Sequence, residues 1–146
     1  MTLLAMLFRK KARKMTFERF KTISNYLIDN EHFDFMLLED IYKYRNEMYS
    51  GKTTEFINDI ALRLQIEYNK SVYVVSRSDV THFNAIGKIN KPTDLFIIPK
   101  HDVFVVVDSY DPEYFNRSSD DNLIESLKYY KIPTLGFCYK QTICFY

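Results

Sequence analysis

Glycine, cysteine and long apolar runs are all scarce in this chain of 146 residues. With only 3 glycines there is no glycine-rich phosphate loop, which excludes the usual dinucleotide and P-loop fingerprints. Cys138 and Cys144 have no second pair or nearby histidine that would complete a zinc site. We expect both to be buried free thiols, which fits a reducing, intracellular setting. Because no apolar run is long enough to cross a bilayer, we expect no transmembrane segment.

Positive and negative charges are nearly balanced in the chain, whose formal net charge is only +1. The sequence therefore predicts no global basic field that would attract nucleic acid. Basic residues do cluster near the N-terminus, after an apolar run at residues 3–8, namely Arg9, Lys10, Lys11, Arg13 and Lys14. We expect residues 1–15 to form a poorly ordered tail, with a peripheral membrane anchor or a nucleic-acid-binding tail as the alternatives.

Apolar residues make up 47% of the chain, and their spacing predicts one folded α/β domain. Helical stripes at 16–29 and 33–49 predict an N-terminal helical extension over residues 16–50. Thr53 or Thr54 would cap a third helix, running to about residue 69. The expected core, residues 51–146, also contains strands at 71–76, 92–98, 103–110, 134–139 and 142–146, a connector at 77–91 and a helix from Asp120 or Asp121. This order predicts a mixed central sheet, with an α-β-β-β-α-β core flanked by helices.

Residues 92–98 and 103–110 have the composition of two apolar strands joined by a short turn. In an antiparallel hairpin, Asp94 at the start of the first strand would lie beside Asp108 in the second. Two adjacent carboxylates repel each other unless a proton or cation neutralises them, and such a pair suits Mg²⁺ or Mn²⁺. The alternative is that these aspartates only bound the strands, because aspartate favours turns. Glu55, in the first turn of its helix, is equally explained as an ordinary capping-region acid.

Four short segments resemble a known family. They are Ser50-Gly51-Lys52-Thr53-Thr54-Glu55, Val75-Ser76-Arg77-Ser78, Pro92-Thr93-Asp94-Leu95-Phe96-Ile97 and Val105-Val106-Val107-Asp108-Ser109-Tyr110. In this order they resemble the motifs of the restriction-endonuclease-like (PD-(D/E)XK) nuclease superfamily, and most closely those of the archaeal Holliday junction resolvases. The resemblance covers about residues 50–139. One residue is inserted between Pro92 and Asp94, and Tyr110 stands where the family has its lysine.

The resemblance implies a metal-dependent DNA endonuclease, with structure selectivity in the manner of a resolvase as one form of this activity. Asp94, Asp108 and the carbonyl of Ser109 would then bind Mg²⁺ or Mn²⁺, with Glu55 completing the site directly or through water. The metal would lower the pKa of a bound water and neutralise phosphate oxygens. The family also implies a homodimer.

With Tyr110 in the place of the lysine, either another lysine replaces it, or catalysis is slow, or the fold keeps only binding. Lys91 is the candidate for the catalytic role, with Lys88 and Lys128 as alternatives. The DNA backbone would be bound by Arg77, Lys88 and Lys91. His82 and Tyr110 are further candidates for DNA contact; the alternatives are that His82 is a solvated loop histidine and that Tyr110 caps its strand.

Three functions therefore compete at this stage. The first is the metal-dependent endonuclease. The second is a catalytically impaired nuclease-like fold that acts as a DNA-binding or protein-interaction module. The third is a small α/β interaction protein in which the acids are incidental. The low glycine and high aromatic content are typical of a rapidly diverged protein, such as a viral one, which would place it in the host cytoplasm.

Overall fold

The computed structural model describes residues 17–40, 52–76, 84–110 and 123–138. Five strands form a single sheet in the order β1-β5-β4-β2-β3, and every neighbouring pair is parallel. The strands are β1 (Met36–Asp40), β2 (Ser71–Ser76), β3 (Gly87–Lys88), β4 (Val103–Tyr110) and β5 (Thr134–Cys138). The α-helices are α2 (Phe17–Asp29), α4 (Lys52–Tyr68) and α6 (Leu123–Tyr129), and a 3-10 helix, η4, covers Pro92–Phe96.

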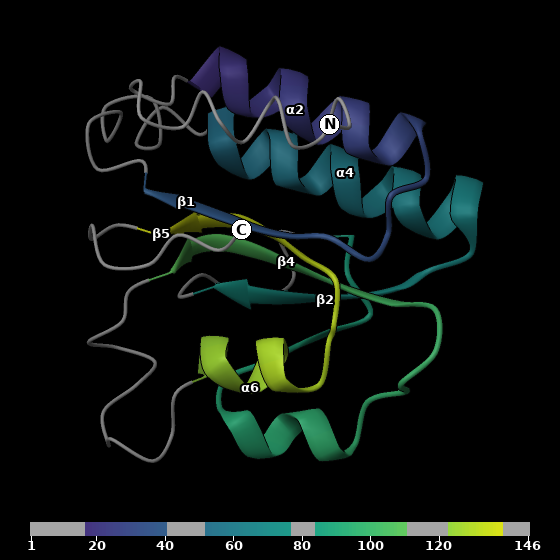
Figure 1. Ribbon diagram of the computed structural model, residues 1–146, viewed down its shortest axis with the longest axis vertical. Coiled ribbons are helices and arrows are strands. Elements are labelled where there is room, and N and C mark those ends of the chain that lie inside the picture. The colour runs from purple at the N-terminus through teal and green to yellow at the C-terminus, as the bar shows by residue number, and fades with distance from the viewer. Residues whose placement is uncertain (1–16, 41–51, 77–83, 111–122, 139–146) are drawn as a thin grey trace, which may run out of the picture.

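The elements form three layers (Figure 1). Helices α2 and α4 cover one face of the sheet, while α6 and η4 lie on the opposite face. The connection from β1 to β2 therefore runs through a helix on one face, and the connection from β4 to β5 runs through a helix on the other. Helices on both faces are the usual companions of a parallel sheet, because parallel strands need crossover connections.

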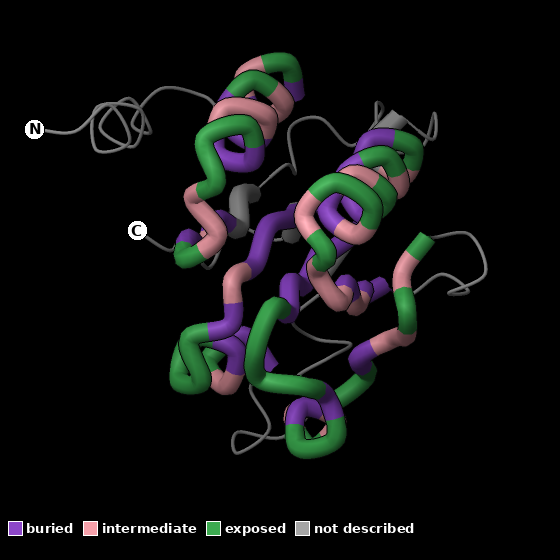
Figure 2. Tube along the Cα trace, turned by 90° about the vertical axis from the view of Figure 1, so that its right-hand side faces the viewer, coloured by how far each residue is buried: buried purple, intermediate pink, exposed green. Residues whose placement is uncertain are grey.

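Strand β4 shows why this sheet is buried on both faces. Phe104 and Val106 pack into the core beneath α2 and α4. Val103, Val105 and Val107 pack into the second core, beneath α6 and η4. Since successive side chains of a strand point to opposite faces, a continuous apolar run is what a central parallel strand needs. Buried residues accordingly lie between the layers, and exposed residues lie on the outer sides of the helices (Figure 2).

The sequence predicted most of these elements. The helix at 16–29 is confirmed as α2 and the helix from Thr53 or Thr54 as α4, while α6 falls within the last predicted helix. The strands at 71–76 and 103–110 are confirmed, and β5 confirms the strand at 134–139 over its described part. The chain is an α/β protein, as predicted. The described sheet, however, is wholly parallel, whereas the sequence predicted a mixed sheet. The tail at 1–15 and the strand at 142–146 lie outside the described residues.

The predicted antiparallel hairpin of residues 92–98 and 103–110 is wrong. Residues 92–96 form η4, and β4 pairs in parallel with β2 and β5 instead. Phe96 and Ile97, which the hairpin would place within a strand, are 67% and 85% exposed. Pro92 offers no N–H to a strand ladder, and the carboxylate of Asp94 accepts hydrogen bonds from the backbone just before it. Both features favour a short helical turn.

The predicted helix at 33–49 is also wrong over its described part. Residues 36–40 form β1, whose register with β5 runs from Met36 opposite Thr134 to Asp40 opposite Cys138. Pairing with a strand far along the chain overrides the local helical spacing, which is a weak preference over so short a segment. As a result, β1 belongs to the same sheet as the predicted core, and α2 shares a hydrophobic core with α4.

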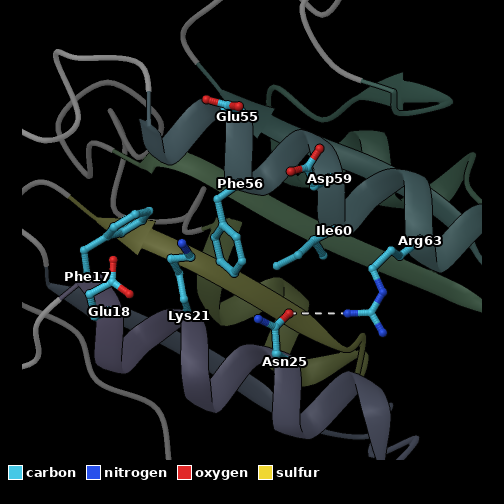
Figure 3. A pocket seen from close by; sticks show the side chains of 9 residues that line it. All are labelled: Phe17, Glu18, Lys21, Asn25, Glu55, Phe56, Asp59, Ile60 and Arg63. Carbon is cyan, nitrogen blue, oxygen red and sulfur yellow. Dashed lines mark hydrogen bonds between the residues drawn. The ribbon is translucent and has the colours of Figure 1, made fainter.

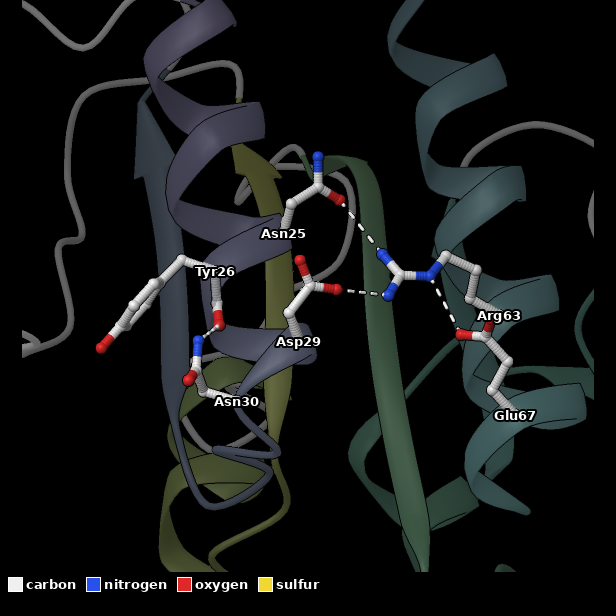
Figure 4. A network of polar contacts seen from close by, with 6 residues as sticks. All are labelled: Asn25, Tyr26, Asp29, Asn30, Arg63 and Glu67. Atoms are coloured by element: carbon white, nitrogen blue, oxygen red, sulfur yellow. Dashed lines mark hydrogen bonds and ion pairs between the residues drawn. The ribbon is translucent and has the colours of Figure 1, made fainter.

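Helices α2 and α4 are joined by a polar network around Arg63 (Figure 4). The guanidinium donates to Asn25 Oδ1 at 3.3 Å and to Asp29 Oδ1 at 2.6 Å, both on α2. It also donates to Glu67 Oε2 at 3.2 Å, one turn further along α4. The hydrogen bond to Asp29 is the main cause that raises the pKa of Arg63, while partial burial acts to lower it. Because a cation with a raised pKa stays charged at any lower pH, this guanidinium remains charged in acidic and neutral solution.

Arg63→Ala is expected to lower the free energy of unfolding by about 0.5–1 kcal/mol, because the network ties two helices together but is partly exposed to water. Arg63→Lys should restore less than half of that loss, since a single ammonium cannot reach three separate acceptors in the geometry of a guanidinium. Glu67→Ala, which keeps both bonds to α2, is the matched control and should cost only a few tenths of a kcal/mol. Urea unfolding measures all three variants, and equal stability of Arg63→Ala and wild type would contradict the role assigned to the network.

Candidate functional site

Strand β4 ends in a buried carboxylate. Asp108 is 2% exposed, and within the described ranges it is the one acid among the buried residues. It follows Phe104 and Val106 on the alternating face of β4, so its side chain lies on the side covered by α2 and α4. Burying a carboxylate is costly unless it is hydrogen-bonded, and the sites where proteins accept this cost are often functional.

The hydroxyl of Thr54 donates to Oδ2 of Asp108 at 3.1 Å. Thr54 is in the first turn of α4, so this bond fixes the start of the helix over the end of β4. Ser76, the last residue of β2, is opposite Asp108 in the strand register and is completely buried. Three polar side chains therefore interrupt an otherwise apolar face where β2 and β4 end. We call Thr54, Ser76 and Asp108 the carboxyl-edge cluster.

The sheet is irregular beside this cluster. Val107 is opposite Gly136 in β5, yet Tyr110 is opposite Cys138, so β4 carries one extra residue between these two pairs. The extra residue falls at Asp108 or Ser109, which makes the end of β4 a bulge. Bulges bend a strand and re-aim its side chains, and they are common beside functional sites.

The position of the cluster is that of a ligand site in many open parallel sheets. Ligands of such sheets bind outside the carboxyl ends of the strands, where the connections diverge to opposite faces. Here the cluster lies at the carboxyl ends of β2 and β4; the helices after β1 and β4 cover opposite faces, but β5 separates β1 from β4. The first backbone N–H groups of α4 have no partner within the helix, and the N-terminus of α4 brings a partial positive charge to this edge, which favours an anion.

Asp94, the predicted partner of Asp108 in a metal site, has a different role. Its Oδ2 accepts hydrogen bonds from the backbone N–H groups of Asn90 at 2.8 Å and Lys91 at 3.1 Å. This carboxylate therefore closes the first turn of η4, on the face of the sheet opposite α4. Because residues 92–98 and 103–110 do not form a hairpin, nothing in the strand pairing places Asp94 beside Asp108.

Asp94→Ala is expected to lower the free energy of unfolding by about 1 kcal/mol, as the loss of a helix cap usually does. Any Mg²⁺ binding at Asp108 should be unchanged in this variant, because the Thr54–Asp108 pair is untouched. Thermal unfolding and calorimetric titration measure the two effects on the same preparation. Loss of metal-dependent binding in Asp94→Ala would contradict this assignment and restore the two-aspartate site.

The other predicted site residues are dispersed. Glu55 is exposed on the outer side of α4, and Lys91 is exposed just before η4. Lys88 is half-buried in β3, and Lys128 is exposed on α6. The backbone of Ser109 and Tyr110 completes β4 at its bulged end. Arg77 and His82 lie outside the described residues.

Glu55 lines a groove of about 520 Å³ between α2 and α4 (Figure 3). Phe17 and Phe56 form part of its apolar wall, and the ammonium of Lys21 lies 5.4 Å from the ring centre of Phe17. The groove opens on the outer side of the helix layer, whereas Thr54 contacts the sheet beneath the same helix. Glu55 and Thr54 are adjacent in sequence, but Glu55 lines the outer groove and Thr54 faces the sheet.

When the chain is compared with known proteins, no family model, curated protein or solved structure matches it. The resemblance to the PD-(D/E)XK nucleases stays a prediction. In the described part of the chain, no group of three or more His, Cys, Asp and Glu residues could hold a metal ion. A metal ion at Asp108 would therefore need water molecules and a bound substrate to supply its other ligands. Over the same residues, no helix has the length and apolar character to cross a membrane.

The sequence around the start of α4 contains part of a phosphate-loop pattern. Gly51-Lys52-Thr53 is the second half of the phosphate-loop pattern G-x-x-x-x-G-K-[ST], with Asn46 where the first glycine would stand. Lys52 is the first residue of α4, which is where that pattern places its lysine. The incomplete pattern alone is weak. The hydroxyl position of the pattern is Thr53, whereas the residue that contacts the buried Asp108 is Thr54, so the match is only partial.

Proposed function

We propose that the carboxyl edge of the sheet binds a nucleoside triphosphate together with Mg²⁺. The observation that carries the proposal is the hydrogen bond from Thr54, in the first turn of α4, to the buried carboxylate of Asp108 at the end of β4. A hydroxyl and a carboxylate suit Mg²⁺, which is usually held by one or two carboxylates together with phosphate oxygens. The start of α4, with Lys52 as its first residue, would receive the phosphates.

Each residue would have a distinct part in binding. Backbone N–H groups at the start of α4 would donate to phosphate oxygens, and the partial positive charge of this helix end would favour them. Asp108 would hold the cation, directly or through a water, while Thr54 orients the carboxylate. Bound Mg²⁺ would neutralise phosphate charge and polarise the phosphoryl group. Asp108 is 2% exposed, so a ligand would have to approach its carboxylate from the edge of the sheet, and the completely buried Ser76 would not contact that ligand.

The metal-dependent DNA endonuclease is the second candidate, because it would use the same Asp108 and the same cation. The observation in its favour is a buried carboxylate at the end of a central strand, which is where the resemblance places one metal ligand. Glu55 and Asp94, the other two acids of that proposal, contact different surfaces. A phosphate ligand that brings its own metal-binding oxygens needs fewer protein carboxylates, so the nucleotide is the better fit.

Isothermal titration of the full chain with ATP, GTP, ADP and inorganic phosphate, with Mg²⁺ and with EDTA, tests the proposal. We expect a triphosphate to bind in the micromolar range with Mg²⁺ and at least about 10-fold more weakly with EDTA. Parallel incubation with supercoiled plasmid and a four-way junction tests the second candidate. Metal-dependent cutting that is lost in Asp108→Asn, without nucleotide binding, would replace the proposal by the endonuclease. No binding to any phosphate ligand and no cutting would overturn both.

A further inference from the structure

Helices η4 and α6 carry an exposed aromatic surface on the face of the sheet opposite α4. Phe96 is 67% exposed, Tyr129 is 79% exposed and Tyr130 is 39% exposed, and beside them Ile97 is 85% exposed. We call these four residues the aromatic patch. Large apolar side chains exposed together, as distinct from scattered singly, usually mark a binding surface.

The rings of the patch are held in a fixed arrangement. Phe96 and Tyr130 have ring centres 6.4 Å apart at an interplanar angle of 83°, and Tyr129 and Tyr130 have centres 5.1 Å apart at 87°. The two elements that carry them are joined beneath the surface, where Leu95 of η4 belongs to the same buried core as Ile124 and Leu127 of α6. Phe96 and Tyr129 therefore stand edge-on to Tyr130 and remain largely open to solvent.

Lysine side chains lie close to these rings. The ammonium of Lys100 lies 5.7 Å from the ring centre of Tyr130 and donates to the carbonyls of Leu95 and Ile98. Lys128 precedes Tyr129 in the chain, and Lys131 follows Tyr130; both are exposed.

A small hollow adjoins the patch. Lys100, His101 and Lys131 line a space of about 200 Å³, together with Lys70 and Asp102, which form an ion pair of 3.2 Å. Because that pair neutralises itself, the hollow keeps the charge of Lys100 and Lys131. A basic hollow next to exposed rings offers an anion site and a stacking surface to the same ligand.

From this combination we propose that the aromatic patch and the basic hollow bind single-stranded nucleic acid. Bases stack on exposed aromatic rings without regard to sequence, and lysines bind the phosphates between them. A second copy of the chain fits the surface less well, because a two-fold interface would bring the same lysines together. This inference does not depend on the proposed nucleotide site, which lies at the carboxyl edge and uses none of these residues.

The test is fluorescence anisotropy of the full chain with a labelled oligothymidylate of about 15 nucleotides, at several salt concentrations. Each ring removed should weaken binding at least about 5-fold, so the double variant Phe96→Ala/Tyr129→Ala should bind at least about 25-fold more weakly than wild type. Lys131→Ala should weaken binding and make it less dependent on salt. Ile66→Ala and Lys21→Ala, on the opposite layer, are the matched controls and should bind as wild type does.

Two confounding results are distinguished by the same variants. The basic residues before Phe17 would give oligonucleotide binding that the double variant does not change, and that result would overturn the proposal. Sedimentation of the chain with anionic phospholipid vesicles, and its oligomeric state in solution, test a membrane and a second copy as occupants. Patch-dependent binding to either of these, without binding of the oligonucleotide, would also overturn it. Thermal unfolding of each variant shows whether a weaker binder is still folded.

Discussion

Asp108→Asn is expected to weaken Mg²⁺-dependent binding of a nucleoside triphosphate by about 100-fold or more, because it removes the buried charge that would hold the cation. The variant should remain folded. An asparagine carbonyl can still accept the hydrogen bond from Thr54, and replacing a buried carboxylate by a neutral group removes a desolvation cost. We expect its free energy of unfolding to lie within about 1 kcal/mol of the wild-type value.

Variants of Thr54 separate the two parts of this argument. Thr54→Ser keeps the hydroxyl and should bind nucleotide nearly as the wild type does. Thr54→Val keeps the volume but removes the donor to Asp108, so it should lose both affinity and about 1–3 kcal/mol of stability. Calorimetric titration and urea unfolding report the two quantities separately. Equal affinity in wild type, Asp108→Asn and Thr54→Val would show that the carboxyl-edge cluster is only structural.

Gly136→Ala is expected to lower the free energy of unfolding by about 3 kcal/mol or more, the largest stability effect that we predict for a single methyl group. A Cβ at this position would lie closer than 3.0 Å to the carbonyl oxygen, Cα and Cβ of Val107 on the neighbouring strand. Backbone atoms in the middle of a sheet cannot move aside without breaking the ladder. A glycine within a strand often marks such a close approach of another backbone.

Gly87→Ala is the matched control for this prediction. Among the described residues its Cβ would meet only the ring of Tyr73, at 3.3 Å, and a side chain can shift where a backbone cannot. We expect a loss below about 1 kcal/mol, measured by urea or thermal unfolding of both variants. If the two substitutions were equally mild, β4 and β5 would not approach each other at Gly136 as described. Because Val107 directly precedes Asp108, Gly136→Ala should also reduce ligand binding in whatever fraction remains folded.

Local sequence patterns were sufficient for some elements and misleading for others. The apolar run that ends at Asp108 predicts a buried strand, because every residue from Val103 to Val107 is suited to a sheet covered on both faces. The run from Leu95 to Ile98 has similar composition, yet only Leu95 and Ile98 are buried. Composition cannot distinguish a buried strand from a short helical turn that exposes half of its apolar side chains. Proline and the capping carboxylate of Asp94 were the better signals.

Local sequence patterns could not predict which strands pair with one another. An antiparallel hairpin is the simplest connection between two adjacent strands, but β4 pairs with β2 and β5, from distant parts of the chain. That error placed Asp94 beside Asp108. It also concealed Thr54, whose hydroxyl meets Asp108 across 54 positions of sequence. Once the sheet is known to be parallel, the start of α4 and the end of β4 are expected at the same edge, and Gly51-Lys52-Thr53 gains its significance.

A crystal structure of the chain with Mg²⁺ and a non-hydrolysable nucleoside triphosphate tests the central claim most directly. The account predicts phosphate oxygens at the N-terminus of α4 and a Mg²⁺ ion bound to Asp108, directly or through one water. The hydroxyl of Thr54 should still contact the same carboxylate or should contact the metal itself. A triphosphate bound elsewhere, for instance in the groove between α2 and α4, or a Mg²⁺ ion held without Asp108, would contradict it.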